Sequence, residues 1–183
     1  MFSKELLYKT EGIILNKEQS NDVDAVLTVY TRNRGKIYVK AKGVRKKESK
    51  LKGFLEPFSH NSFLLARSKT WADVLAGAET IEYFAIIFQD VQRLALAFFI
   101  AETLDKTIVV PERDEEMWQF IVKVFQTLND KKYAPEKIKV AFEKRILEML
   151  GYGHSGKNLL NQICELAGEE IKSHKFLTQV LNA

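Results

Sequence analysis

The hydrophobic residues of this chain follow two different periods, and this change constrains the fold more than any other feature of the sequence. Up to about residue 84, apolar and polar residues alternate with the period of two that is typical of β-strands. Beyond it, apolar residues recur every three to four positions, as they do along one side of an α-helix. We therefore predict two domains, a β-rich one over residues 1–84 and a helical one over residues 85–183.

The β-rich part contains short runs of β-branched and aromatic residues separated by polar or glycine-containing segments. The expected strands are Leu6–Leu15, Ala25–Thr31, Gly35–Val44, His60–Arg67 and Ala72–Phe84. Five short strands predict a small barrel, because closing the sheet removes its exposed edges.

The second part contains runs with helical period whose ends carry proline or glycine. The expected helices are Phe88–Val109, Asp114–Leu128, Pro135–Leu150, Lys157–Ala167 and Ser173–Leu181. The first run is apolar on nearly all sides, so we expect it at the centre of a helical bundle. The predicted fold class is α+β, with a five-stranded β-barrel followed by an all-α bundle.

Positive charge is concentrated in the first half of the chain. Residues 1–80 hold 15 Lys+Arg against 9 Asp+Glu, a net charge of +6, whereas residues 81–183 hold 13 against 15, a net charge of −2. Within residues 32–52 alone, ten basic residues accompany a single acid, Glu48, so this segment carries +9. Such a density of cations indicates a binding site for a polyanion.

The segment Asn33–Gly35 lies between the second and third expected strands and predicts a three-residue hairpin loop, with glycine in the left-handed conformation. This loop would pair Arg32 with Lys36 and Tyr30 with Tyr38. One face of the hairpin would then be apolar, and the other basic with two tyrosines.

We interpret the basic face as a nucleic-acid surface, because cations neutralise phosphates and aromatic rings stack on bases. No base-reading motif is present, so the surface should follow backbone and shape rather than sequence. A plainer interpretation is a solvated strand whose lysines protect a sheet edge from aggregation. The residues expected to bind nucleic acid are Arg32, Arg34, Lys36, Tyr38, Lys40, Lys42, Arg45, Lys46, Lys47, Lys50, Lys52, Arg67 and Lys69.

No constellation of residues indicates catalysis, so we predict neither an enzyme nor a cofactor. The segment Gly151–Lys157 matches the first seven positions of a phosphate-binding P-loop, but Asn158 stands where a hydroxyl would hold magnesium. We expect a helix end and a turn there, with a nucleotide hydrolase as a weaker alternative. The histidines have only a single cysteine, Cys164, to complement them as metal ligands. We therefore expect them at loop or surface positions rather than in a metal site. They are His60, His154 and His174.

The longest uninterrupted apolar run lies between Arg93 and Glu102 and is far shorter than the roughly 20 residues that cross a bilayer. The N-terminus lacks the order of charged and apolar residues of a signal peptide. We expect no membrane association and a cytoplasmic, nucleoid-associated location.

Several segments together resemble the bacterial RecO family of recombination mediators in order and spacing. They are Glu11–Leu15, Leu27–Thr31, Gly35–Ile37, Lys40–Arg45, Leu51–Gly53, Leu55–Phe58, Phe142–Glu143 and Leu147–Tyr152. The resemblance covers about residues 8–152 and implies an N-terminal OB-fold joined to a helical domain. Many relatives carry a four-cysteine zinc module after the last segment, and with only Cys164 we expect no zinc here.

The resemblance also implies a function in DNA repair and recombination through the RecF pathway. Family members bind single- and double-stranded DNA, anneal complementary strands, and act with the RecR protein to load RecA onto DNA coated by the single-stranded-DNA-binding protein, SSB. In the family, the acidic, phenylalanine-ended SSB tail docks on the helical domain. The cations available there in this chain are Arg93, Lys123, Lys137, Lys139, Lys144 and Arg145. An alternative is an OB-fold RNA-binding module without a recombination role, and the plainest fallback is a scaffold that binds no nucleic acid.

Overall fold

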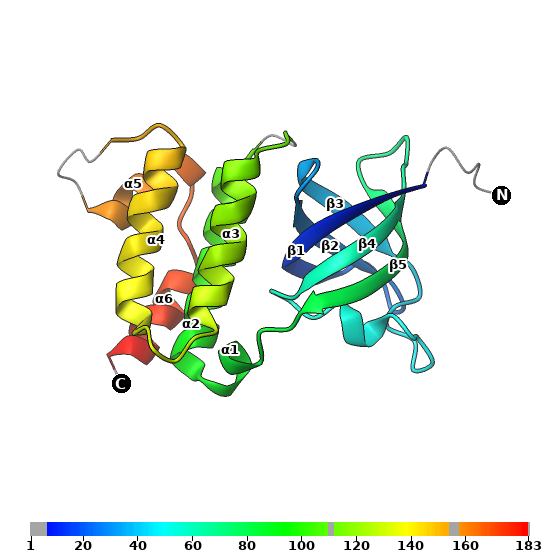
Figure 1. Ribbon diagram of the computed structural model, residues 1–183, viewed down its shortest axis with the longest axis horizontal. Helices are drawn as coiled ribbons and strands as arrows, with labels where there is room; N and C mark the ends of the chain where they lie inside the picture. Colours follow the sequence, from blue (N-terminus) through cyan, green and yellow to red (C-terminus); the bar gives the residue numbers. More distant parts are fainter. Residues whose placement is uncertain (1–6, 110–111, 154–157, 183) are drawn as a thin grey trace. The chain divides into compact units, whose positions relative to one another are not determined.

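The computed structural model describes residues 7–109, 112–153 and 158–182, and it has the predicted α+β architecture (Figure 1). The chain forms two compact units. The first comprises residues 1–83 with 109–118, and the second comprises residues 84–108 with 119–183. The division into domains over 1–84 and 85–183 stays a prediction, and the compact units place residues 109–118 with the barrel.

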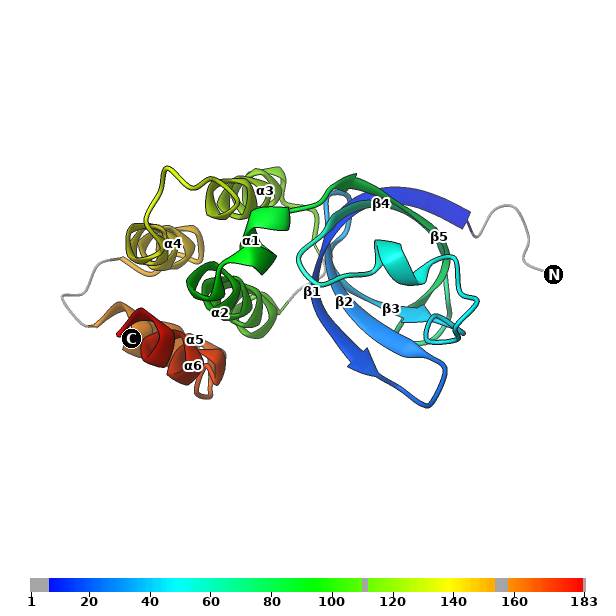
Figure 2. The same ribbon diagram turned by 90° about the horizontal axis from the view of Figure 1, so that it is seen from below.

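The first unit contains a closed five-stranded barrel with the strand order β1-β2-β3-β5-β4. Its elements are β1 (Leu7–Gln19), β2 (Ala25–Thr31), β3 (Gly35–Ala41), η2 (Lys52–Phe54), β4 (His60–Ala66) and β5 (Asp73–Glu82). Alternate strand residues such as Leu27, Val39 and Leu65 fill the interior and are fully buried. The short helix η2 lies across one end of the barrel (Figure 2), and the buried Leu55 follows it.

The register of the hairpin between β2 and β3 differs from the expected one. Thr31 pairs with Gly35 and Tyr30 with Lys36, so the loop consists of residues 32–34 and the pairing of Tyr30 with Tyr38 was wrong. Because the shift is two residues along one strand, each side chain keeps its face of the sheet. Ile37 and Val39 still point into the core, and Lys36, Tyr38 and Lys40 still lie on the outer face.

Gly35 explains why the loop consists of residues 32–34 instead of the expected 33–35. Its φ of 61° is left-handed, and a Cβ at this position would lie 2.3 Å from the backbone oxygen of Glu112. The segment 112–118 therefore passes directly against the end of the hairpin, and only glycine fits there. Farther along this segment, Trp118 lies edge-on to His60 at 5.3 Å between ring centroids. His60 is buried in β4, so the expected loop or surface position was wrong for this residue.

The second unit is a bundle of helices. Its elements are α1 (Ala85–Gln89), α2 (Val91–Thr107), most of α3 (Glu115–Leu128), α4 (Pro135–Met149), α5 (Leu159–Ala167) and α6 (Ser173–Leu181). Helix α2 contacts α1, α4, α5 and α6, which confirms its predicted central position. No helix in the described part of the chain is long and apolar enough to cross a membrane.

The expected helix Phe88–Val109 is instead two helices, which meet at Asp90. The Asp90 backbone is extended, and its carboxylate accepts hydrogen bonds from the backbone N–H groups of Gln92 and Arg93. These are the contacts of an N-cap, which satisfies donors that lack an intrahelical partner. The apolar period continues through residue 90, so periodicity alone did not reveal the break.

Helix α4 ends as predicted, in a glycine turn. Gly151 has a φ of 82°, and the N–H groups of Gly151 and Tyr152 donate to the carbonyls of Glu148 and Leu147 at 3.0 and 2.8 Å. This is a helix C-cap in which glycine takes the left-handed position. The remainder of the P-loop-like segment, residues 154–157, lies outside the described residues.

Glu102 of α2 anchors the start of α6. Its carboxylate accepts hydrogen bonds from the N–H groups of Ser173 and Lys172 at 2.7 and 2.9 Å, and from Lys106 Nζ at 2.9 Å. Partial burial alone would raise the pKa of Glu102, but the hydrogen bonds from Ser173 and Lys106 outweigh it and lower the pKa to about 2.

We expect this carboxylate to make the stability of the bundle depend on pH. Because the pKa of Glu102 in the folded chain lies below its ordinary value of 4.5, its contribution is complete above pH 4.5 and is lost as pH falls towards about 2. The variant Glu102→Gln should be less stable than the wild type at pH 7, and the difference should shrink at pH 3. Chemical denaturation at both pH values measures it, with the exposed Glu79→Gln as control. A difference that is the same at both pH values would contradict this role.

Candidate nucleic-acid interface

The outer face of β3 presents the polar residues of the basic hairpin. Lys36, Tyr38 and Lys40 alternate with the core residues, and the Tyr38 side chain is 40% exposed. Strand β5 runs parallel to β3 at Val39 and Lys40. This pairing brings the loop between β4 and β5, residues 67–72, beside the outer face of β3.

Trp71 in this loop is the most important residue that sequence reasoning missed. The residue is 63% exposed, and its ring centroid lies 5.5 Å from that of Tyr38 in an edge-on arrangement. The ammonium group of Lys40 lies 5.2 Å from the centre of the Trp71 ring, within the range of a cation–π interaction. We call Tyr38, Lys40 and Trp71 the aromatic platform. A single tryptophan in a loop gives no periodic signal, and only the parallel pairing of β3 with β5 places it on the site.

Arg34 holds the loop that carries Trp71. Its guanidinium lies 2.7 Å from both Asp73 Oδ2 and Tyr8 Oη, and Asp73 Oδ1 accepts the N–H of Ser68 at 2.8 Å. Burial, together with the hydrogen bond and charge of Asp73, raises the pKa of Tyr8 to about 12. The charge of Arg34 is thus matched within the barrel, and this residue positions the platform.

The charge of Arg32 is likewise matched by acids of the same unit. Its guanidinium donates to both carboxylate oxygens of Glu115, at 3.1 and 3.3 Å, and lies 3.7 Å from Glu11. Tyr30, which was expected on the exposed basic face, is buried with 1% exposure. Burial and the nearby Asp114 carboxylate raise the pKa of Tyr30. Of the two tyrosines on this face, Tyr38 is therefore the one that a ligand can reach.

The chain continues from β3 into residues 42–52, which we call the basic loop. Its start is fixed to the loop between β1 and β2. The Gly43 N–H donates to Asp24 Oδ1 at 2.7 Å, and Arg45 donates from its N–H to Val23 O at 3.0 Å. The Gly43 hydrogen bond lowers the pKa of Asp24. The exposed cations of the basic loop are Lys42, Arg45, Lys46, Lys47, Lys50 and Lys52, and Arg67 and Lys69 are exposed in the loop that holds Trp71.

In the helical unit, the cations expected to dock an acidic tail lie in different environments. Arg93 is buried and donates to backbone carbonyls, so it faces no ligand. Lys139 lies 2.6 Å from Glu143, and Arg145 lies 3.2 Å from Glu148. Lys123 on α3, and Lys137 and Lys144 on α4, are exposed. In the described part of the chain, no group of three or more His, Cys, Asp or Glu side chains could hold a metal ion.

A closed barrel of five strands in the order β1-β2-β3-β5-β4 is an OB-fold, a class whose β2–β3 face and adjoining loops bind oligonucleotides and oligosaccharides. The fold thus defines an OB-fold protein with a basic outer face, joined to a helical bundle.

Comparisons with known proteins identify the family. Residues 4–84 match the family model for the recombination protein O N terminal, and residues 88–167 match that for the recombination protein O C terminal. The chain belongs to the RecO family.

Several relatives carry the name DNA repair protein RecO. Those of Bifidobacterium longum subsp. infantis and Desulforudis audaxviator are each 32% identical over 80% of this chain, which covers 62% and 57% of their lengths. That of Bifidobacterium adolescentis is 32% identical over 91% of this chain and 66% of its own length. The chain thus spans about three fifths of the length of these relatives.

Proposed function

We propose that this chain is a non-enzymatic DNA-binding protein of repair and recombination. It binds single- and double-stranded DNA on the barrel, anneals complementary strands, and assists RecA loading onto SSB-coated DNA together with RecR. The observation that carries the proposal is the aromatic platform of Tyr38, Lys40 and Trp71 beside the basic loop. Membership of the RecO family supports the assignment to repair and recombination.

The platform and the basic loop suit the two chemical parts of a DNA strand. An exposed tryptophan offers a flat face on which an unpaired base can stack, whatever its sequence. The cations of the basic loop can follow the phosphates and release counterions. A single strand would use both contacts, whereas a duplex, with its bases already stacked, would use the cations alone.

Annealing follows from such a surface without hydrolysis. Two complementary strands repel each other through their phosphates, and a surface that neutralises phosphates lowers this repulsion. Contacts to phosphates carry no sequence information, so the base edges stay free to pair. The surface would therefore promote pairing of any complementary strands.

For the SSB tail, α4 offers the most suitable surface of the helical unit. Lys137, Val140 and Lys144 are exposed and lie at helical spacing, so cations flank an apolar side chain that is 44% exposed. An acidic peptide with an apolar end requires this combination. We assign tail docking to these residues together with Lys123 on α3.

The variant Trp71→Ala tests the platform. We expect its affinity for single-stranded DNA to fall about tenfold, because stacking on an aromatic side chain contributes roughly 1–3 kcal/mol per base. Duplex affinity should change by less than about twofold, since paired bases do not reach the ring. Fluorescence anisotropy with labelled oligonucleotides of equal length measures both affinities.

The conservative variant Trp71→Phe keeps a ring and should retain most of the single-strand affinity. An equal loss of affinity for single strands and duplexes in Trp71→Ala would contradict stacking at this position. Single-stranded and structured RNA at the same salt concentration complete the comparison. Tighter binding of structured RNA than of single-stranded DNA would favour the alternative of an RNA-binding module.

A further inference from the structure

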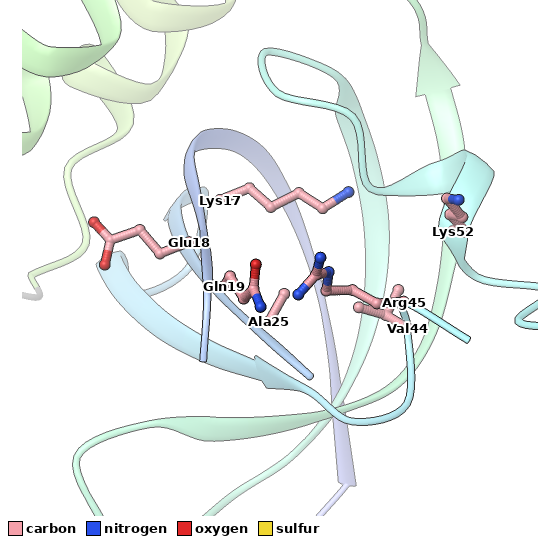
Figure 3. A pocket seen from close by; sticks show the side chains of 7 residues that line it. All are labelled: Lys17, Glu18, Gln19, Ala25, Val44, Arg45 and Lys52. Carbon is pink, nitrogen blue, oxygen red and sulfur yellow. The ribbon is translucent and has the colours of Figure 1, made fainter. Parts of the chain in front are cut away.

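A cavity of about 330 Å³ opens on the barrel beside the basic loop (Figure 3). It is lined by the end of β1, the start of β2, the turn after β3 and the first residue of η2. The lining residues are Lys17, Glu18, Gln19, Ala25, Val44, Arg45 and Lys52. This volume lies at the low end of the range of small-molecule sites and leaves room for one nucleotide rather than for a run of stacked bases.

Three cations border the cavity. In Figure 3, the Lys17 ammonium group and the Arg45 guanidinium point towards the same space, and Lys52 lies across from them. Among the described residues, neither Lys17 nor Lys52 forms an ion pair with a carboxylate. Their charges are therefore available to a ligand.

One of the three cations, Arg45, is held in place by contacts within the barrel. The Arg45 guanidinium donates to the carbonyl oxygen of Asn21 at 3.1 Å, and its backbone N–H donates to Val23 O at 3.0 Å. Both contacts fix Arg45 to the loop between β1 and β2. Lys17 lies in β1 opposite Leu27, in a regular part of the sheet. Ordering the Arg45 guanidinium in advance lowers the entropic cost of binding.

The acid of the cavity does not neutralise these cations. Glu18 accepts a hydrogen bond from the Asn16 side-chain amide at 2.8 Å, and Figure 3 shows its side chain pointing away from Lys17 and Arg45. Glu18 therefore leaves Lys17 and Arg45 free to face a ligand. The buried Val44 and Ala25 form a small apolar floor.

We propose that this cavity binds the terminal phosphate of a nucleic-acid strand together with its nucleotide. A terminal phosphate carries about −1.5 to −2 at pH 7 and has three acceptor oxygens, whereas an internal phosphate carries a single charge. Three converging cations favour the more highly charged group, and a space for one nucleotide suits a strand end. The inference rests on the proposed function, because it assigns a strand end to a cavity beside the DNA-binding surface.

Short thymidine oligonucleotides with a 5′-phosphate, a 3′-phosphate or hydroxyl groups at both ends test the proposal. With the intact chain, we expect at least one of the two phosphorylated forms to bind three- to tenfold more tightly than the hydroxyl form, and the comparison identifies which end is bound. In Lys17→Gln, this preference should disappear while the affinity for the hydroxyl form changes little.

Two variants with the same change of charge serve as controls. Lys9→Gln lies on the same strand outside the cavity, and Lys47→Gln lies in the basic loop. Lys9→Gln should change neither affinity. Lys47→Gln should weaken both forms equally and leave their ratio unchanged.

Equal affinity for phosphorylated and hydroxyl ends would overturn the terminal-phosphate site and leave DNA binding intact. Persistence of the preference in Lys17→Gln would also overturn it. Absence of binding to every oligonucleotide would instead overturn the proposed function itself.

Discussion

Reversal of the charge at five positions, Lys40, Lys42, Arg45, Lys46 and Lys47, should abolish DNA binding while the barrel stays folded. Each contact between a cation and a phosphate releases counterions when DNA binds. Each lost contact therefore makes the slope of the logarithm of the binding constant against the logarithm of the salt concentration less steep, by about 0.7 for single strands and 0.9 for duplexes. Five reversed charges also repel the backbone, so we expect affinity to fall at least about a thousandfold at moderate salt.

The fold should tolerate these substitutions, because the loop residues among them are exposed and exposed positions change stability little. Thermal unfolding by circular dichroism verifies this, and anisotropy across a salt titration measures the affinity. A control with the same change of net charge reverses exposed lysines of the helical unit: Lys123, Lys131, Lys132, Lys137 and Lys144. If the barrel variant retains its affinity, the assigned surface is wrong and the basic face of β3 is only a solvated face of the barrel.

Replacement of Arg93 by methionine should produce the largest loss of stability in the helical unit. The guanidinium donates to the carbonyl oxygens of Leu128, Asp130 and Tyr133 at 2.7, 3.1 and 2.8 Å, and only 4% of the residue is exposed. These carbonyls belong to the end of α3 and the connection to α4. Methionine would leave them without their charged donor, at a cost of about 3–5 kcal/mol.

Urea denaturation measures this loss, and a fall in Tm of about 10 °C should accompany it. The control is Arg145→Met on α4, which removes an exposed ion pair with Glu148 and should cost less than about 1 kcal/mol. Arg93→Lys should recover only part of the loss, because an ammonium group cannot reproduce the planar fork of a guanidinium. Equal stability of Arg93→Met and Arg145→Met would show that Arg93 does not stabilise the connection between α3 and α4.

The strands and helices follow from hydrophobic period and end signals where these agree. Ala25–Thr31 and Ser173–Leu181 have the expected bounds. The hairpin register was predicted wrongly because a contact distant in sequence decides the local conformation there. The hairpin register depends on the approach of Glu112 to Gly35, and a pattern within the hairpin carries no information about that approach.

In the candidate site too, some features could be predicted from the sequence and others depend on the fold. Charge density identified the basic loop, because a run of cations is visible in the sequence itself. Burial of individual cations is not visible there, so Arg93 was counted among the residues available to a partner although it lies inside the bundle. Trp71 was missed for the opposite reason, because its exposure and its place beside Tyr38 depend on the pairing of β3 with β5.

Annealing of DNA strands by this chain is tested by the pairing rate of complementary labelled oligonucleotides coated with the cognate SSB. The reaction is followed with and without the protein, in the absence of ATP and across a salt titration, with uncoated strands as control. We predict faster pairing of coated strands that declines as salt rises, because phosphate neutralisation is screened. An unchanged pairing rate for both coated and uncoated strands would contradict the proposed annealing.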